Sequence, residues 1–228
     1  MKPYQQVPIV ECGEAIVAIP TEFLRMSPHP YEKLGAPYGT RSPFYLRQGV
    51  VDRLLIAQQT LQKNHPNWRL QIFDAYRPVA VQQFMVDYTF LEVAQTQNLI
   101  PENLSDEQRQ DILQRVYQFW AVPNLDPKMP PPHSTGAAID LTLVDEKGSA
   151  IDMGSPIDEI SERSFPNHFV KGSDFYQRRQ ILNQAMTTAG FKRHWNEWWH
   201  FSYGDQVWAW LMRQENPGQL FVAKYGRV

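Results

Sequence analysis

The 228-residue sequence has almost no cysteine, because Cys12 is the single one. One cysteine excludes an intrachain disulfide and a zinc site built from several thiolates, so any metal would be held by nitrogen and oxygen. The chain also has no run of about 18 apolar residues, which excludes a membrane-spanning helix. Its start lacks a basic segment followed by an uninterrupted apolar stretch, so the sequence predicts a cytoplasmic protein.

Positive charge is not in excess either, since the formal net charge is −2. A nucleic-acid or membrane-surface partner requires a basic footprint, so neither is expected, and a small substrate fits better. Hydrophobic residues make up 43% of the chain and charged residues 20%, which is typical of a folded globular protein. The length predicts one domain over residues 1–228, and the sequence does not indicate an oligomeric state.

Apolar periodicity and capping residues predict five helices. Ser105 and Gln108 match a capping box, and Gly190 suits the position after a helix end. Pro78 is expected in the first turn of its helix. The expected helices cover residues 50–62, 78–97, 105–120, 173–189 and 205–214.

The predicted strands are short and few. Residues 70–73 and 138–144 follow the strand period, and the aromatic stretch at 194–201 (HWNEWWHF) is expected to be a third strand. No glycine-rich phosphate turn follows any of them. These elements predict an α+β fold with a small, mainly antiparallel sheet flanked by helices.

The segment from His133 to Asp140 (HSTGAAID) combines an imidazole, a turn glycine and a carboxylate on the polar face of the following strand. A stiff proline-rich loop before His133 could bring the two groups into one cleft, which supplies two of the three protein ligands of a hydrolytic zinc. Spacing alone does not distinguish this from an unrelated histidine and aspartate.

Glu197 and His200 are three residues apart, and in a regular strand they would point to opposite faces. Both can reach one site only if Glu197 lies at an irregular entry to the strand or if the strand is bulged there. The alternative is a surface ion pair at Glu197 and a hydrogen-bonded core histidine at His200.

Arg77 follows a predicted strand in DAYRP (74–78). Its guanidinium could face an oxyanion or a substrate carboxylate. Equally, it could pair with Asp74 or Glu92.

Five segments together resemble the D-alanyl-D-alanine dipeptidase family, the VanX-type zinc dipeptidases. The matching segments, in the family's order, are DAYRP (74–78), HSTGAAIDLTL (133–143), MGSPIDE (153–159) with ERS (162–164), GF (190–191) and EWWHF (197–201). The resemblance implies a zinc-dependent dipeptidase that acts on D-Ala-D-Ala or a close dipeptide, a step in cell-wall peptide metabolism.

Carried over by position, the resemblance implies one zinc ion per chain, in a cleft beside the sheet. The resemblance assigns the metal ligands to His133, Asp140 and His200. It assigns the catalytic acid/base to Glu197 and the stabilisation of the tetrahedral intermediate to Arg77. Asp158 is assigned to the substrate ammonium group.

One position departs from the family pattern. The family usually has a serine two residues before the first metal histidine, and here that position is Pro131, which has neither a hydroxyl nor a backbone N–H. The departure leaves open which dipeptide is preferred. Alternatives are a related D,D- or L,D-carboxypeptidase and a non-catalytic zinc-containing module that binds peptidoglycan fragments.

The remaining histidines lie outside the matched segments. His29, His65 and His168 are expected on the surface or in loops, and His194 is a candidate neighbour of the metal ligands.

Overall fold

The computed structural model describes residues 2–228 and contains a five-stranded sheet. The strand order is β2 (Leu24–Arg25), β4 (Arg69–Asp74), β5 (Ala138–Val144), β7 (His200–Ser202) and β6 (Lys192–Arg193). Only the β2–β4 pair is parallel among these strands, and the other three pairs are antiparallel. The predicted α+β fold with a small, mainly antiparallel sheet is confirmed.

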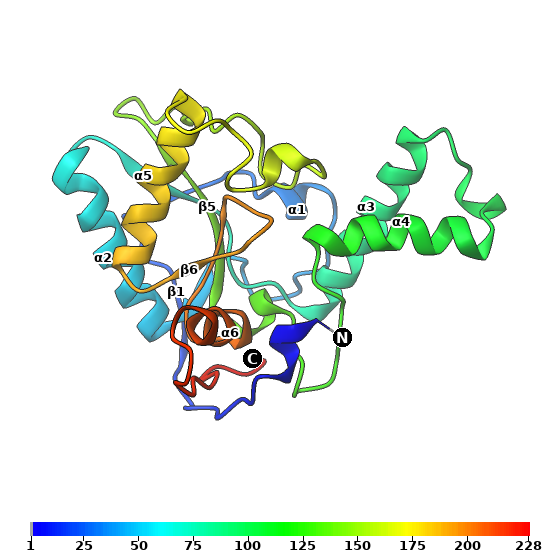
Figure 1. Ribbon diagram of the computed structural model, residues 1–228, viewed down its shortest axis with the longest axis horizontal. Coiled ribbons are helices and arrows are strands. Elements are labelled where there is room, and N and C mark those ends of the chain that lie inside the picture. Colours follow the sequence, from blue (N-terminus) through cyan, green and yellow to red (C-terminus); the bar gives the residue numbers. More distant parts are fainter. Residues whose placement is uncertain (1) are drawn as a thin grey trace.

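The central strand β5 separates the apolar core from the polar face of the sheet. Every one of its residues is buried. Ile139, Leu141 and Leu143 belong to the main apolar core, which α2 (Gln48–Asn64) and α5 (Asp174–Thr188) also build. Those two helices lie side by side against the sheet (Figure 1). Strand alternation then directs Asp140 to the opposite face.

A second apolar cluster packs against Phe73 of β4. It is formed by α1 (Pro30–Lys33), α3 (Val79–Thr96) and α4 (Asp106–Phe119), with Tyr31 and Trp120 among its buried aromatic residues. In Figure 1, α3 and α4 project together to one side of the molecule. One domain for residues 1–228 stays a prediction.

The predicted helix limits agree with the observed ones to within about two residues. Ser105 and Gln108 form the expected capping box, and Gly190 follows the end of α5 with φ +94°, a conformation that side chains disfavour. Pro78 is the N-cap of α3 rather than a residue of its first turn. The last helix, α6 (Gln206–Glu215), begins after Asp205, whose side chain accepts from the backbone N–H of Trp208.

The prediction of one strand over 194–201 is wrong. Within this range only His200 and Phe201 are in a strand, at the start of β7, and residues 194–199 between β6 and β7 are irregular. The backbone N–H of Trp198 donates to the carbonyl of Ser164, so this segment hydrogen-bonds to a distant loop instead of continuing a ladder.

Other short elements carried no clear periodic signal in the sequence. A separate antiparallel pair of strands is formed by β1 (Ile16–Ala18) and β3 (Tyr45–Arg47). The 3₁₀ turns are η1 (Pro3–Gln6), η2 (Pro101–Asn103), η3 (Pro132–Thr135) and η4 (Glu162–Ser164). Among residues 2–228, no helix has the length and apolar character needed to cross a membrane.

Candidate metal centre and active site

Sheet pairing brings three predicted metal ligands together. Asp140 on β5 lies directly opposite His200 on β7, so both side chains project from the same face. His133 comes from η3, the turn that leads into β5. Gly136 ends this turn with φ +68°, and a Cβ on it would approach the side chain of Ile16 to 3.1 Å. Glycine is therefore required where the chain turns from His133 into the strand.

The ligand atoms of this cluster lie within hydrogen-bonding distance of one another. His133 Nε2 lies 3.1 Å from His200 Nδ1 and 3.2 Å from one oxygen of Asp140. His200 Nδ1 lies 3.0 Å from the other oxygen of Asp140. All three residues are buried. Burial raises the pKa of Asp140, but His133 and His200 outweigh it and hold that pKa well below its usual range.

Neighbouring groups orient both imidazoles. His133 Nδ1 donates to the carbonyl of Ala75 over 2.7 Å, which turns Nε2 toward the cluster. On the far side of His200, Nε2 lies 3.5 Å from Ser202 Oγ, and that hydroxyl donates to Asp205 over 2.9 Å. Both rings therefore present a nitrogen lone pair to the same point as the Asp140 carboxylate.

This donor set fits a zinc ion. Two imidazoles and a carboxylate are the protein ligands of many catalytic zinc sites, and bonds of about 2.0–2.2 Å place neighbouring ligand atoms about 3.3–3.5 Å apart. The separations of 3.0–3.2 Å are close to that geometry. Convergent lone pairs repel one another, so a cation between them would relieve the repulsion.

Glu197 lies just before β7, in the irregular segment rather than within a strand. This is one of the two conditions under which Glu197 and His200 can share a site. Glu197 Oε2 is 3.6 Å from His200 Nδ1, and Oε1 is 3.4 Å from His194 Nδ1. The side chain is buried, so the surface ion pair considered as an alternative is wrong. Burial, followed by the nearby charge of Asp140, raises the pKa of Glu197 well above its usual range.

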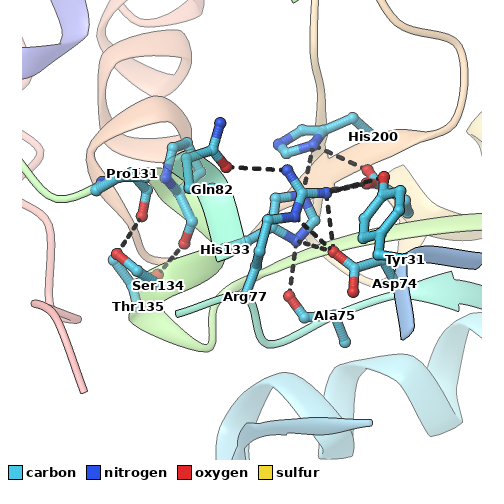
Figure 2. A network of polar contacts seen from close by, with 12 residues as sticks. Tyr31, Asp74, Ala75, Arg77, Gln82, Pro131, His133, Ser134, Thr135 and His200 are labelled. Atoms are coloured by element: carbon cyan, nitrogen blue, oxygen red, sulfur yellow. Dashed lines mark hydrogen bonds and ion pairs between the residues drawn. The ribbon is translucent and has the colours of Figure 1, made fainter. Parts of the chain in front are cut away.

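Arg77 is held by a buried polar network (Figure 2). Its Nε donates to Asp74 over 2.9 Å, and Nη1 donates to Gln82 over 3.0 Å. Its Nη2 donates to Asp140 over 3.2 Å and to the Tyr31 hydroxyl over 3.3 Å. The predicted pairing with Asp74 is thus present, yet the same guanidinium reaches a candidate metal ligand and lines the pocket.

Asp74 is the buried anchor of this network. It receives hydrogen bonds from Tyr38 over 2.9 Å and from Arg77, and His29 Nε2 lies 3.1 Å from it. Burial raises the pKa of Asp74, but Arg77 and His29 outweigh it and keep that pKa low. His29 lies in a loop just before α1, as one part of the expectation has it, but it is not on the surface, because its side chain is buried by three aromatic rings.

Asp158 lines the same pocket from a loop. Its φ of +66° is unusual for a residue with a side chain, and aspartate and asparagine tolerate this conformation best. The Tyr31 hydroxyl donates to Asp158 over 2.7 Å. Burial, followed by the charge of Asp140, raises the pKa of Asp158 to about 7.

One pocket therefore contains all six residues proposed from the sequence. His194, the candidate neighbour of the metal ligands, also lines it, and so do residues that the motifs did not indicate: Lys2, Tyr4, Gln82 and Trp120. In the sequence, Lys2, Tyr4 and Tyr31 lie far from every matched segment, so motif spacing could not indicate them. His168 is exposed, as expected, and His65 is partly buried against Trp68.

The chain matches one protein-family profile and curated relatives over different shares of its length. The D-ala-D-ala dipeptidase profile of the Peptidase_M15 family matches residues 25–217. A D-alanyl-D-alanine dipeptidase of Synechocystis sp. is 50% identical over 240 residues, covering 100% of this chain and 97% of that one. A D-alanyl-D-alanine dipeptidase of Escherichia coli is 48% identical over 69 residues, 30% of this chain and 36% of that one.

Among solved structures, the similarity is partial and the sequence identity is low. VanYB in complex with D-alanine-D-alanine is 13% identical with a TM-score of 0.47, covering 77% of this chain and 84% of that one.

Proposed function

Because this chain belongs to the D-Ala-D-Ala dipeptidase family of metallopeptidases, we propose that it hydrolyses D-alanyl-D-alanine with one zinc ion per chain. The observation that carries the proposal is the convergence in one pocket of a metal-binding triad, a buried carboxylate beside it, and a second carboxylate further along the wall.

His133, Asp140 and His200 would hold the zinc. When bound, the ion acts as a Lewis acid that polarises a carbonyl oxygen and makes a water molecule acidic near pH 7. The Ala75 carbonyl and the Ser202 hydroxyl keep the two imidazoles in the orientation that this requires.

Glu197 would be the acid/base. Its carboxylate lies within 3.6 Å of a metal-facing nitrogen but is not one of the three ligand groups. In this role Glu197 accepts a proton from the attacking water and returns it to the leaving nitrogen of the peptide. Burial raises the pKa of Glu197 and so favours the protonated carboxyl, which is the form that donates to the leaving nitrogen.

Arg77 would stabilise the negative charge that develops on the scissile carbonyl oxygen. The network with Asp74, Gln82 and Tyr31 fixes the guanidinium before substrate binds, so little reorganisation is needed in the transition state.

Asp158 would bind the free ammonium group of the dipeptide and so select against longer peptides. A substrate with a blocked amino end leaves this carboxylate without a partner, which is unfavourable in a partly buried site. This role would favour a dipeptidase over a carboxypeptidase, because a carboxypeptidase accepts blocked amino ends. Pro131, at the position of the family's usual serine, bears on which dipeptide is preferred.

We further propose a role in cell-wall peptide metabolism and a cytoplasmic location. The role rests on the chemistry of the proposed substrate. The location rests only on the sequence pattern, and cell fractionation with detection of the tagged protein checks it.

The decisive experiment measures metal and activity on the same preparation. Protein purified without added metal should contain zinc by plasma emission analysis, and it should release D-alanine from D-Ala-D-Ala. Chelation should abolish release and added zinc should restore it. Protein with neither zinc nor zinc-dependent hydrolysis would refute the proposal.

Two further comparisons separate the alternatives. Glu197→Gln should keep the metal and lose most turnover, whereas loss of both would indicate a structural role for Glu197. Equal hydrolysis of free and N-acetylated substrates would indicate a carboxypeptidase. Zinc-loaded protein that binds peptidoglycan fragments without cleaving any dipeptide would indicate a binding module.

A further inference from the structure

Two basic side chains other than histidine line the pocket, Arg77 and Lys2, and they differ in their hydrogen-bond and ion-pair partners. Arg77 is held by two carboxylates, an amide oxygen and a phenol oxygen. Lys2 also lines the pocket, and among residues 2–228 no carboxylate forms an ion pair with it. The charge of Glu197, which shares the pocket wall, raises the pKa of Lys2 without forming an ion pair with it. Lys2 is therefore the cation of the pocket that remains free for a ligand.

The backbone at Lys2 is fixed by several contacts. Lys2 is the N-cap of η1, and its backbone N–H donates to Gln5 Oε1 over 2.8 Å. Gln206 on α6 donates to the carbonyl of Val7 over 2.6 Å and to that of Gln5 over 3.3 Å. Figure 1 shows this turn lying beside α6. The ammonium of Lys2 is thus carried by an ordered segment that packs over the pocket.

A neighbouring side chain closes the same part of the wall. Tyr4, on η1, is only 2% exposed and also lines the pocket. The side chain of Lys2 is itself partly buried, and this burial lowers its pKa, although Glu197 acts in the opposite direction. A partly desolvated ammonium without a counter-ion is unfavourable, and a bound carboxylate would compensate it.

A free dipeptide carries two opposite charges at neutral pH. Its ends are separated by about 7 Å at full extension, so a site for a dipeptide needs an anion and a cation at about that spacing. The proposed function assigns the anion, Asp158, but assigns no group to the terminal carboxylate.

We propose that Lys2 binds the terminal carboxylate of the substrate and so makes the enzyme selective for a dipeptide with a free carboxyl end. This inference rests on the proposed dipeptidase function, because it concerns the second residue of the same substrate. Lys2 precedes residues 25–217, the range that the family profile matches. The carboxylate contact thus comes from a part of the chain outside the family core.

The test compares D-Ala-D-Ala with D-Ala-D-alaninamide, which lacks the terminal negative charge. Lys2→Met should raise KM for the dipeptide at least tenfold, and the loss in kcat/KM should be at least tenfold larger for the dipeptide than for the amide. Lys2→Arg should recover part of the loss. Lys33→Met, at an exposed lysine of α1, is the matched control for removal of one positive charge.

Equal losses on the two substrates would overturn the proposal, because they would show that Lys2 acts through Glu197 or through the fold. An unchanged KM for the dipeptide in Lys2→Met would overturn it as well. A shifted pH profile with both substrates would identify the effect on Glu197.

Calorimetry separates failure of this inference from failure of the proposed function. In the Glu197→Gln background, D-Ala-D-Ala should bind at least tenfold more weakly when Lys2 is replaced by Met, and the amide should show a smaller change. If the wild-type protein hydrolyses neither substrate, the dipeptidase function fails. The binding comparison then still decides whether Lys2 recognises a carboxylate.

Discussion

Replacing Asp158 with asparagine should stabilise the metal-free protein while it impairs catalysis. The pKa of Asp158 rises from 3.8 to about 7, first because of burial and second because of Asp140. An acid with a raised pKa in the folded state makes its stabilising contribution at low pH. That contribution is lost as the pH rises from about 4 to about 7, because the unfolded chain ionises first.

The size of the effect follows from the shift. One pKa unit corresponds to about 1.4 kcal/mol, so a shift of about three units gives an upper bound of about 4 kcal/mol above pH 7. The Asp158 side chain is partly exposed, which reduces the figure to about 2 kcal/mol at pH 8 and to less than about 1 kcal/mol at pH 5. Asparagine tolerates the φ of +66° and can still accept the Tyr31 hydrogen bond, so the substitution mainly removes the charge.

Urea unfolding of the chelated protein at pH 5 and pH 8 measures this effect. The gain in the free energy of unfolding for Asp158→Asn should be larger at pH 8 by about 1–2 kcal/mol. Asp111→Asn, at an exposed carboxylate of α4, serves as the control and should give the same change at both pH values. A gain that does not grow with pH, or a destabilisation at pH 8, would refute the reasoning.

The same variant should lose activity and selectivity. Loss of a charged hydrogen-bond partner for the substrate ammonium corresponds to about 10- to 100-fold in kcat/KM. The preference for free over N-acetylated substrate should fall with it. In the wild type, kcat/KM for the dipeptide should rise with pH through about 7, as Asp158 ionises. A site that is stabilised when its binding charge is removed illustrates a conflict between function and stability.

Three other perturbations test the remaining groups of the site. Tyr31→Phe removes a hydrogen bond that lowers the pKa of Asp158, so the rise of kcat/KM should move to higher pH, as measured by a pH–rate profile. Arg77→Lys should lower kcat by about 10²- to 10³-fold in steady-state assays while zinc content is kept, because an ammonium cannot reproduce the planar contacts to Asp74. Chelation should lower the melting temperature of the wild type in calorimetry but not that of His200→Ala, because that variant lacks one of the three candidate ligands.

Part of the fold followed from local sequence signals. Hydrophobic periodicity and caps such as Ser105 act within a few residues, so the helices were predicted nearly to their ends. The segment 194–201 was misjudged because its aromatic residues favour a strand locally, whereas the loop around Ser164 takes the backbone hydrogen bond of Trp198. Tertiary contacts therefore determine the conformation of residues 194–201.

The candidate site was also only partly predictable from the sequence. The residues His133, Asp140, Glu197 and His200 were selected by a motif resemblance, and the structure brings them together. The motifs gave no sign of His29, whose burial depends on the distant Asp74 and on three aromatic rings from other parts of the chain.

The sequence by itself determined the type of donor atoms, the helices and the family, since composition, periodicity and motif order are properties of the chain alone. Only the tertiary structure decided that Asp140 and His200 lie opposite each other, that Glu197 lies outside the strand, and that Lys2 reaches the pocket. The physical reason is that these positions are set by strand pairing and packing between residues that are 34 (Ser164 and Trp198) to 199 positions apart, which no local pattern encodes.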